Sequence, residues 1–244
     1  MVDRVFADRR LAALYDLLAP WGEADDRFYL PLVMAASSVL DVGCGTGQLL
    51  IAAREAGHDG RLCGLDPAQA MLDQARARSD VIWILGDLSN VSVPWTFDLI
   101  VMTGHAFQVF VTDDQLRAAL AAIRDALAPD GRFAFETRNP AARAWDSWTP
   151  DYVTEITTPT GSSARFSRNA EPPDGDLVRF TSTFTSSDWD GPRFSHSTLR
   201  FLDAGSLSSF LADAGLTIVE QFGDWDRATL SAASPEIITI ARRS

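Results

Sequence analysis

The sequence of 244 residues contains no lysine, so arginine supplies all 21 of its basic side chains. Aspartate and glutamate outnumber them at 33, which gives a formal net charge of −12 at pH 7. No cluster of basic residues interrupts this acidic background. Proteins that bind nucleic acids normally present a basic face. We therefore expect neither DNA nor RNA among the substrates or partners.

Cysteine and histidine are also scarce. The two cysteines, Cys44 and Cys63, lack the spacing of a zinc site, and three histidines are too few for a His-rich metal centre. We therefore expect no bound metal. A buried, apolar environment is the expected role for both thiols.

Long apolar runs are absent as well. No stretch approaches the ~18 uninterrupted apolar residues of a membrane helix. The first ten residues are charged and lack the apolar core of a signal peptide. These features predict a cytoplasmic protein without a membrane partner. The length and the apolar content of 46% fit one large globular domain, or one domain with an insertion.

The most informative segment runs from Val39 to Gly47 and reads VLDVGCGTG. It predicts a buried strand, then a turn with three alternating glycines, then a helix after Gln48. Such a turn lets the backbone approach a ligand, and the free N–H groups of the helix point toward it. The dinucleotide fingerprint fails, because Gln48 stands where its third glycine should be, and no P-loop sequence follows. An ordinary strand-to-helix turn would not need three glycines.

Strands and helices alternate over the first 140 residues. Apolar periodicity predicts two helices, at 9–18 and 26–36, and another before the fifth strand. This βα alternation predicts a parallel sheet with helices on both faces, a doubly wound α/β fold. The five expected strands lie at 38–42, 61–65, 81–85, 97–102 and 132–137.

After residue 140 the composition changes to stretches rich in Thr, Phe and Val, separated by Pro and Gly. They predict an antiparallel β insertion with strands at 152–158, 164–168, 177–185 and 193–201. A helix at 206–214 and strands at 216–222 and 236–241 follow. We divide the chain into an N-terminal helical lid (1–37), a sheet domain (38–140 and 202–244) and the insertion (141–201). The insertion would recognise substrate or form a homodimer through its strands.

An acidic residue followed by Gly-x-Gly-x-Gly, as found from Asp41 to Gly47, resembles motif I of the class I S-adenosylmethionine (SAM) methyltransferases. The resemblance covers residues 38–138 and, less closely, about the last 40 residues. It implies a Rossmann-like sheet of seven strands in the order 3-2-1-4-5-7-6, with the last strand antiparallel. It also implies SAM as cofactor, S-adenosylhomocysteine as product, and methyl transfer to O or N of a small organic acceptor. The Asn/Asp-Pro-Pro-Tyr/Phe signature of enzymes that methylate base amino groups is missing after strand four.

The resemblance assigns the cofactor to the carboxyl ends of the first strands. Asp66 would accept hydrogen bonds from the ribose, although before Pro67 it would also suit a helix N-cap. Asp87 would bind the adenine amino group and Leu88 would stack on the ring. Met71 would cover the adenine or pack in the core. The expected cofactor residues are Tyr15, Asp41, Gly43, Cys44, Gly45, Gly47, Asp66, Pro67, Met71, Gly86, Asp87, Leu88, Met102 and Thr103.

Asp41 and the N-terminal tyrosines have structural alternatives to a role in cofactor binding. Asp41 ends a strand that should be buried, where an unpaired charge is costly. The resemblance resolves this, because it puts Asp41 near loop N–H groups and the cofactor's amino group. Tyr15 or Tyr29 would touch the cofactor carboxylate or close the pocket, although aromatic residues at such spacing are as often simply packed.

Methyl transfer from a sulfonium is an in-line displacement that requires alignment and exclusion of water. A base is needed only where the acceptor must lose a proton. His105 follows strand four, where the acceptor should lie, and is the candidate base, although an isolated loop histidine is more often not catalytic. The expected substrate residues are Glu136 and Arg138 after the fifth strand, and Trp145, Trp148 and His196 in or near the insertion.

Two alternatives share parts of this pattern. A NAD-type oxidoreductase has the same fold and a ribose carboxylate, but its glycine spacing fails here. A non-catalytic module that still binds SAM would keep all the cofactor residues, since a fold alone does not fix function.

Overall fold

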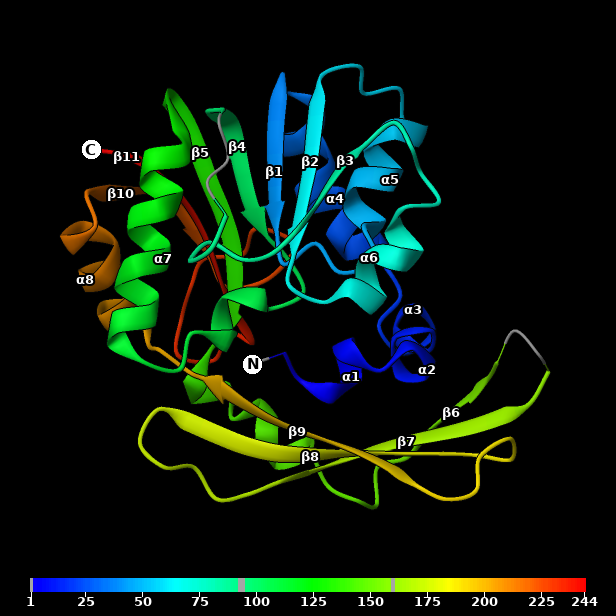
Figure 1. The fold of residues 1–244 in the computed structure, drawn as a ribbon. Coiled ribbons are helices and arrows are strands. Elements are labelled where there is room, and N and C mark those ends of the chain that lie inside the picture. The colour runs from blue at the N-terminus through cyan, green and yellow to red at the C-terminus, as the bar shows by residue number, and fades with distance from the viewer. Residues whose placement is uncertain (1, 92–94, 159–160) are drawn as a thin grey trace.

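A seven-stranded sheet forms the centre of the molecule (Figure 1), a computed structural model that describes residues 2–91, 95–158 and 161–244. Its strand order is β10-β11-β5-β4-β1-β2-β3, and only β11 runs antiparallel to its neighbours. This confirms the expected Rossmann-like sheet and its order. The strands are β1 (Ser38–Val42), β2 (Arg61–Asp66), β3 (Ile82–Leu85), β4 (Phe97–Met102), β5 (Leu127–Arg138), β10 (Leu216–Phe222) and β11 (Glu236–Arg243).

Helices cover both faces of this sheet (Figure 1). α4 (Glu23–Met34) and α5 (Gln48–Glu55) pack on one face, and α7 (Asp113–Ala126) and α8 (Ala204–Asp213) pack on the other. α6 (Gln69–Ala75) contacts β2 and β3. None of the helices in the described ranges has the length and apolar character needed to span a bilayer.

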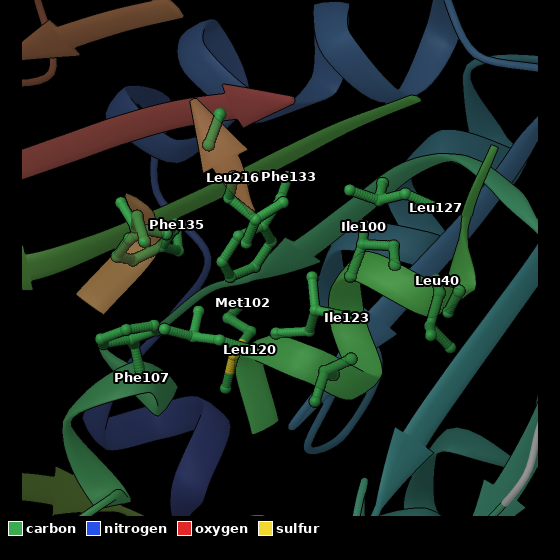
Figure 2. Packing of buried hydrophobic residues seen from close by; sticks show 14 of the residues in the cluster. Leu40, Ile100, Met102, Phe107, Leu120, Ile123, Leu127, Phe133, Phe135 and Leu216 are labelled. Atoms are coloured by element: carbon green, nitrogen blue, oxygen red, sulfur yellow. The ribbon is translucent and has the colours of Figure 1, made fainter. Parts of the chain in front are cut away.

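The alternation of side chains on β1 explains why both faces are covered. Val39 packs with the residues of α4 and α5, whereas Leu40 and Val42 pack with those of α7 and α8. Asp41 lies on the Val39 side and is the polar exception. Figure 2 shows the α7 side of the core, where these aliphatic and aromatic side chains meet: Leu40, Ile100, Met102, Phe107, Leu120, Ile123, Leu127, Phe133, Phe135 and Leu216.

The N-terminal segment differs from the expectation of one helix at 9–18. It forms three short helices, α1 (Arg4–Ala7), α2 (Arg9–Ala12) and α3 (Tyr15–Leu18). Leu11 and Leu14 pack against the insertion, while Ala12 and Tyr15 pack with residues that begin α6. A single straight helix could not serve both surfaces with these side chains. The prediction of a continuous helix was therefore wrong.

The insertion forms a separate antiparallel sheet, as expected, in the order β6-β7-β8-β9. It lies beyond the carboxyl ends of β1 and β4, with α1 to α3 between the two sheets (Figure 1). Val178, Phe180 and Phe184 alternate along its inner face. The strands are β6 (Thr154–Thr157), β7 (Ser163–Ala170), β8 (Leu177–Ser186) and β9 (Arg193–Arg200). Two 3-10 helices, Pro140–Ala142 and Ala144–Ser147, lie between β5 and β6, and another, Ala106–Val109, follows β4.

Candidate active site

The glycine turn between β1 and α5 presents backbone rather than side chains. Gly43, Gly45 and Gly47 have φ angles of 78°, 56° and 81°, in the left-handed region that favours glycine. A Cβ atom on Gly47 would also lie 2.3 Å from the Trp83 ring. Both backbone conformation and available space therefore require glycine at this position.

A cavity of about 170 Å³ lies beside this turn. Met102 does not reach it, because its side chain points into the core (Figure 2). The structure therefore does not bring the Met102 side chain to this cavity, and its contact with the cofactor stays a prediction. Gly47 is the N-cap residue of α5 and is not one of the residues that line this cavity. The structure brings six other expected cofactor residues to the cavity: Tyr15, Asp41, Gly43, Cys44, Gly45 and Thr103.

Asp41 is the most unusual group in this cavity. The residue is only 1% exposed, and its Oδ1 atom has no hydrogen-bond partner within the described ranges. Burial, reinforced by the negative charges of Asp66 and Glu136, raises the pKa of Asp41 to about 8. An unpartnered buried carboxylate is costly unless a cation or donor satisfies it. This corner of the cavity therefore suits a positively charged ligand group.

Asp66 supports the glycine turn from the end of β2. Its Oδ2 accepts the Gly45 N–H at 2.8 Å, and its Oδ1 accepts the Ala68 N–H at 2.7 Å, just before α6. Asp66 does not cap α6, because the N-cap of that helix is Ala68, so the N-cap alternative was wrong; the bond to Ala68 lies in the turn before the helix. A carboxylate has about four acceptor positions, so the contact to ribose stays a prediction beside it. Met71 is buried with Ala12 and the start of α6, which favours the core alternative, and its contact with the adenine stays a prediction.

A second, larger cavity of about 1440 Å³ lies between the sheet domain and the insertion. Its lining includes the predicted adenine residues Gly86, Asp87 and Leu88, together with Pro67. The Asp87 carboxylate accepts the N–H and the hydroxyl of Ser89, at 2.8 Å and 2.5 Å. The structure therefore separates the expected cofactor residues into two neighbouring groups, at the glycine turn and after β3.

His105 forms a pair with Glu236, which begins β11. The His105 Nε2 atom lies 3.0 Å from Glu236 Oε2, while Nδ1 makes no hydrogen bond within the described residues. Burial, with the positive charge of Arg138, lowers the pKa of His105 to about 3. Burial raises the pKa of Glu236 to about 7. The imidazole is therefore uncharged near neutral pH, and in the tautomer whose Nε2–H donates to Glu236 the Nδ1 atom is the acceptor.

Glu136 lies beneath His105, at the end of β5. Its Oε1 accepts the His105 N–H at 2.7 Å, and its Oε2 accepts the Tyr29 hydroxyl. Both Glu136 and Tyr29 are fully buried. The carboxylate holds His105 in its left-handed conformation, with φ at 61°. This position fits a positioning residue rather than the expected contact with substrate, and it keeps Tyr29 away from the cavity.

The other expected substrate residues do not converge. Arg138 lies at the site, where its Nη1 donates to Gln108 Oε1 at 3.0 Å. Trp145 is instead buried in the insertion against Phe201, with ring centroids 4.7 Å apart. His196 is exposed at the rim of the larger cavity and bonds across strands to Thr181 Oγ1. The structure does not bring Trp145 to either of the two cavities, and a contact with substrate stays a prediction.

Glu236 is a site residue that sequence reasoning missed. It lies about 130 positions after His105, and no motif marks it. The signal that could have identified it is strand register, because the antiparallel pairing of β11 with β5 sets Glu236 opposite Arg138. That register was not fixed by the hydrophobic pattern alone.

Residues 39–131 match a family model described as a methyltransferase domain. The 2-phytyl-1,4-naphtoquinone methyltransferase of Thermosynechococcus vestitus is 34% identical over 168 residues, which cover 62% of this chain and 72% of that protein. The chain spans only 43% and 46% of the length of two other curated relatives, which are also methyltransferases.

Two solved structures share the fold over nearly the whole chain. The CcbJ methyltransferase from Streptomyces caelestis superposes with a TM-score of 0.75 at 20% identity, covering 95% of this chain and 96% of that one. SAM-bound CalS10 from Micromonospora echinaspora, an amino pentose methyltransferase involved in calicheamicin biosynthesis, has a TM-score of 0.65 at 26% identity, with coverage of 91% and 90%.

Proposed function

Because the chain belongs to the class I SAM-dependent methyltransferase family, we propose that it transfers the methyl group of SAM to an oxygen or nitrogen of a small organic acceptor. By their names, one relative acts on a naphtoquinone and one structural neighbour on an amino pentose, which supports a small acceptor. Family membership favours methyl transfer over hydride transfer. The free Nδ1 of His105 favours a working enzyme over a module that only binds SAM.

The unpartnered carboxylate of Asp41 is the observation that carries this proposal. The methionine part of SAM has an ammonium group, which is the cation that would satisfy the buried Oδ1 atom. The glycine turn would allow close approach of this part of the cofactor. Tyr15 and Thr103 line the same cavity and would enclose it.

The remaining cofactor residues fit the same orientation. Asp66 would hold the ribose, while Asp87 and Leu88 would hold the adenine in the larger cavity. When bound, SAM supplies a methyl group on a sulfonium sulfur. The contribution of the chain is alignment and the exclusion of water.

His105 would act where the acceptor must lose a proton. Its uncharged Nδ1 would take the proton from an acceptor hydroxyl or ammonium group. Glu236 would accept the Nε2–H and stabilise the imidazolium that forms, while Glu136 holds the backbone N–H of His105. This arrangement resembles the base-and-orienting-group logic of other proton-transfer sites.

We also propose roles for the N-terminal segment and the insertion. Residues 1–37 would act as the lid over the cofactor, because Tyr15 and Trp21 line the smaller cavity. Residues 141–201 would recognise the acceptor, since Phe180 and other insertion residues line the larger cavity. A homodimer would form through β6 or β9, the terminal strands of the insertion sheet. Light scattering on the purified protein tests this last point.

Calorimetry with S-adenosylhomocysteine and NAD tests the proposed function. We expect S-adenosylhomocysteine to bind and Asp41→Asn to weaken it by about tenfold or more, the value of a charge-assisted hydrogen bond. Asp213→Asn, on the exposed surface of α8, is the matched control and should bind like the wild type. Binding of NAD without binding of S-adenosylhomocysteine would overturn the proposal.

A further inference from the structure

Two arginines meet at one indole ring next to the candidate active site. Arg138 ends β5 and Arg168 lies on β7 of the insertion. Their guanidinium carbons lie 5.5 Å and 5.4 Å from the centroid of Trp148. Arg168 also lies against Phe166 and Phe180, at 5.1 Å and 5.7 Å. Two positive charges from different sheets thus share one aromatic platform.

Neither guanidinium has a carboxylate partner within ion-pair distance in the described ranges, although the chain carries 33 acidic residues. Arg168 donates no hydrogen bond there, and its Nε is buried and unpartnered. Arg138 bonds to the neutral amide of Gln108, and Glu236, the acid that most favours its charge, is bonded to His105. Burying charged groups without an anion is costly. The pair is therefore incomplete as it stands.

The position of the pair connects it with both cavities. Tyr15 lines the smaller cavity, and burial raises its pKa, while the charges of Arg168 and Arg138 act in the opposite direction. Phe180 lines the larger cavity and lies against Arg168. The arginines also lie close enough to His105 to disfavour its protonation. An anion bound to them would offset that field and make His105 a stronger base.

We propose that the methyl acceptor carries a carboxylate or phosphate group, which binds to Arg138 and Arg168 beside the Trp148 ring. The planar guanidinium groups would each offer two parallel N–H donors to such an anion. This inference rests on the proposed methyl transfer, because it identifies the bound anion as part of the acceptor. The competing occupant is the carboxylate of SAM itself, and the experiment separates the two.

Anion titrations on matched variants test this inference. Inorganic phosphate and acetate are titrated separately at constant ionic strength, with and without S-adenosylhomocysteine, and binding is followed by calorimetry. Arg168→Gln removes the charge. Arg165→Gln makes the same change on the outer face of β7, where Arg165 pairs with Glu155 at 3.1 Å. Arg168→Lys keeps the charge, and the melting temperature of each variant reports its folding.

We expect saturable binding of at least one anion to the wild type, weakened about tenfold or more by Arg168→Gln and unchanged by Arg165→Gln. Arg168→Lys should bind more tightly than Arg168→Gln. Preference for phosphate or for acetate identifies which anion the acceptor carries. Affinity for S-adenosylhomocysteine should be the same in all variants.

Three results would overturn the inference. They are the absence of anion binding to the wild type, equal anion binding by the wild type and Arg168→Gln, and loss of S-adenosylhomocysteine affinity in Arg168→Gln. The last would assign the arginines to the cofactor carboxylate. Failure of the wild type to bind S-adenosylhomocysteine would instead count against the proposed function, and the anion titration without it remains a separate readout.

Discussion

Replacing Asp41 by asparagine should make the protein more stable at neutral pH. The carboxyl is buried beside the smaller cavity with one oxygen unpartnered, and its pKa is raised to about 8. In the unfolded chain an aspartate has a pKa near 3.9. Between these two pKa values, the carboxyl is therefore protonated in the folded state and ionised in the unfolded state. Asparagine removes this difference, because it is neutral in both states.

The magnitude follows from the two pKa values. For an acid with a raised folded-state pKa, the contribution of that group to the free energy of unfolding is highest below pH 4. It falls by about 1.4 kcal/mol per pH unit up to pH 8. At pH 7, about three units above the unfolded-state pKa, the penalty is about 4 kcal/mol as an upper limit. The advantage of Asp41→Asn should therefore grow by about 3 kcal/mol between pH 5 and pH 7.

Urea unfolding of the wild type, Asp41→Asn and Asp213→Asn at pH 5, 6 and 7 measures this difference. Because other buried acids also titrate, the quantity to compare is the variant minus the wild type at each pH. Asp213→Asn should show a constant difference. The reasoning is refuted if the difference for Asp41→Asn stays constant from pH 5 to pH 7, or if the variant becomes relatively less stable as the pH rises.

Three further results are expected. Binding of S-adenosylhomocysteine at pH 7 should release nearly one proton, because the ammonium group of the ligand lowers the pKa of Asp41. Calorimetry in buffers of different ionisation enthalpy measures the number of protons released. An Asp41→Asn variant that releases as many protons as the wild type would contradict this expectation. The 15N signals of His105 should shift near pH 7 as Glu236 loses its proton and should lose this inflection in Glu236→Gln; an unchanged inflection would refute the assignment. Gly47→Ala should lower the free energy of unfolding by about 2–5 kcal/mol, because it adds a clash with the indole ring to the backbone strain. Gly57→Ala, at φ 89° with open space around it, should cost only about 1–2 kcal/mol, so equal losses in urea unfolding would contradict the argument.

The sheet was predictable because each of its strands carries a local signal. The apolar runs of β1 and β4 and the regular spacing of Leu116, Leu120 and Ile123 in α7 specify elements without reference to distant residues. The three alternating glycines likewise indicate the turn without reference to distant residues. The N-terminal helix was mispredicted because its course depends on two surfaces, the insertion and α6, that the local pattern does not contain.

The candidate site was predictable only where one segment supplies it. Asp41 lies near the end of β1 within the glycine motif, and His105 follows β4, so motif and position within one segment indicated them. Glu236 and Arg168 reach the site through antiparallel register and through the packing of one sheet on another. Register changes by one residue would turn either side chain to the opposite face, and no short motif specifies it.

The place of β11 in the sheet has a consequence for how the chain folds during synthesis. In sequence order this strand comes after the other six strands of the sheet, yet it fits between β5 and β10 rather than at the border of the sheet. Until it emerges from the ribosome, residues 132–138 of β5 have one unpaired side, and β10 has no neighbour in the sheet. An unpaired strand is a site of aggregation. The nascent chain therefore cannot complete its sheet, or bring Glu236 to His105, until translation has passed Arg243.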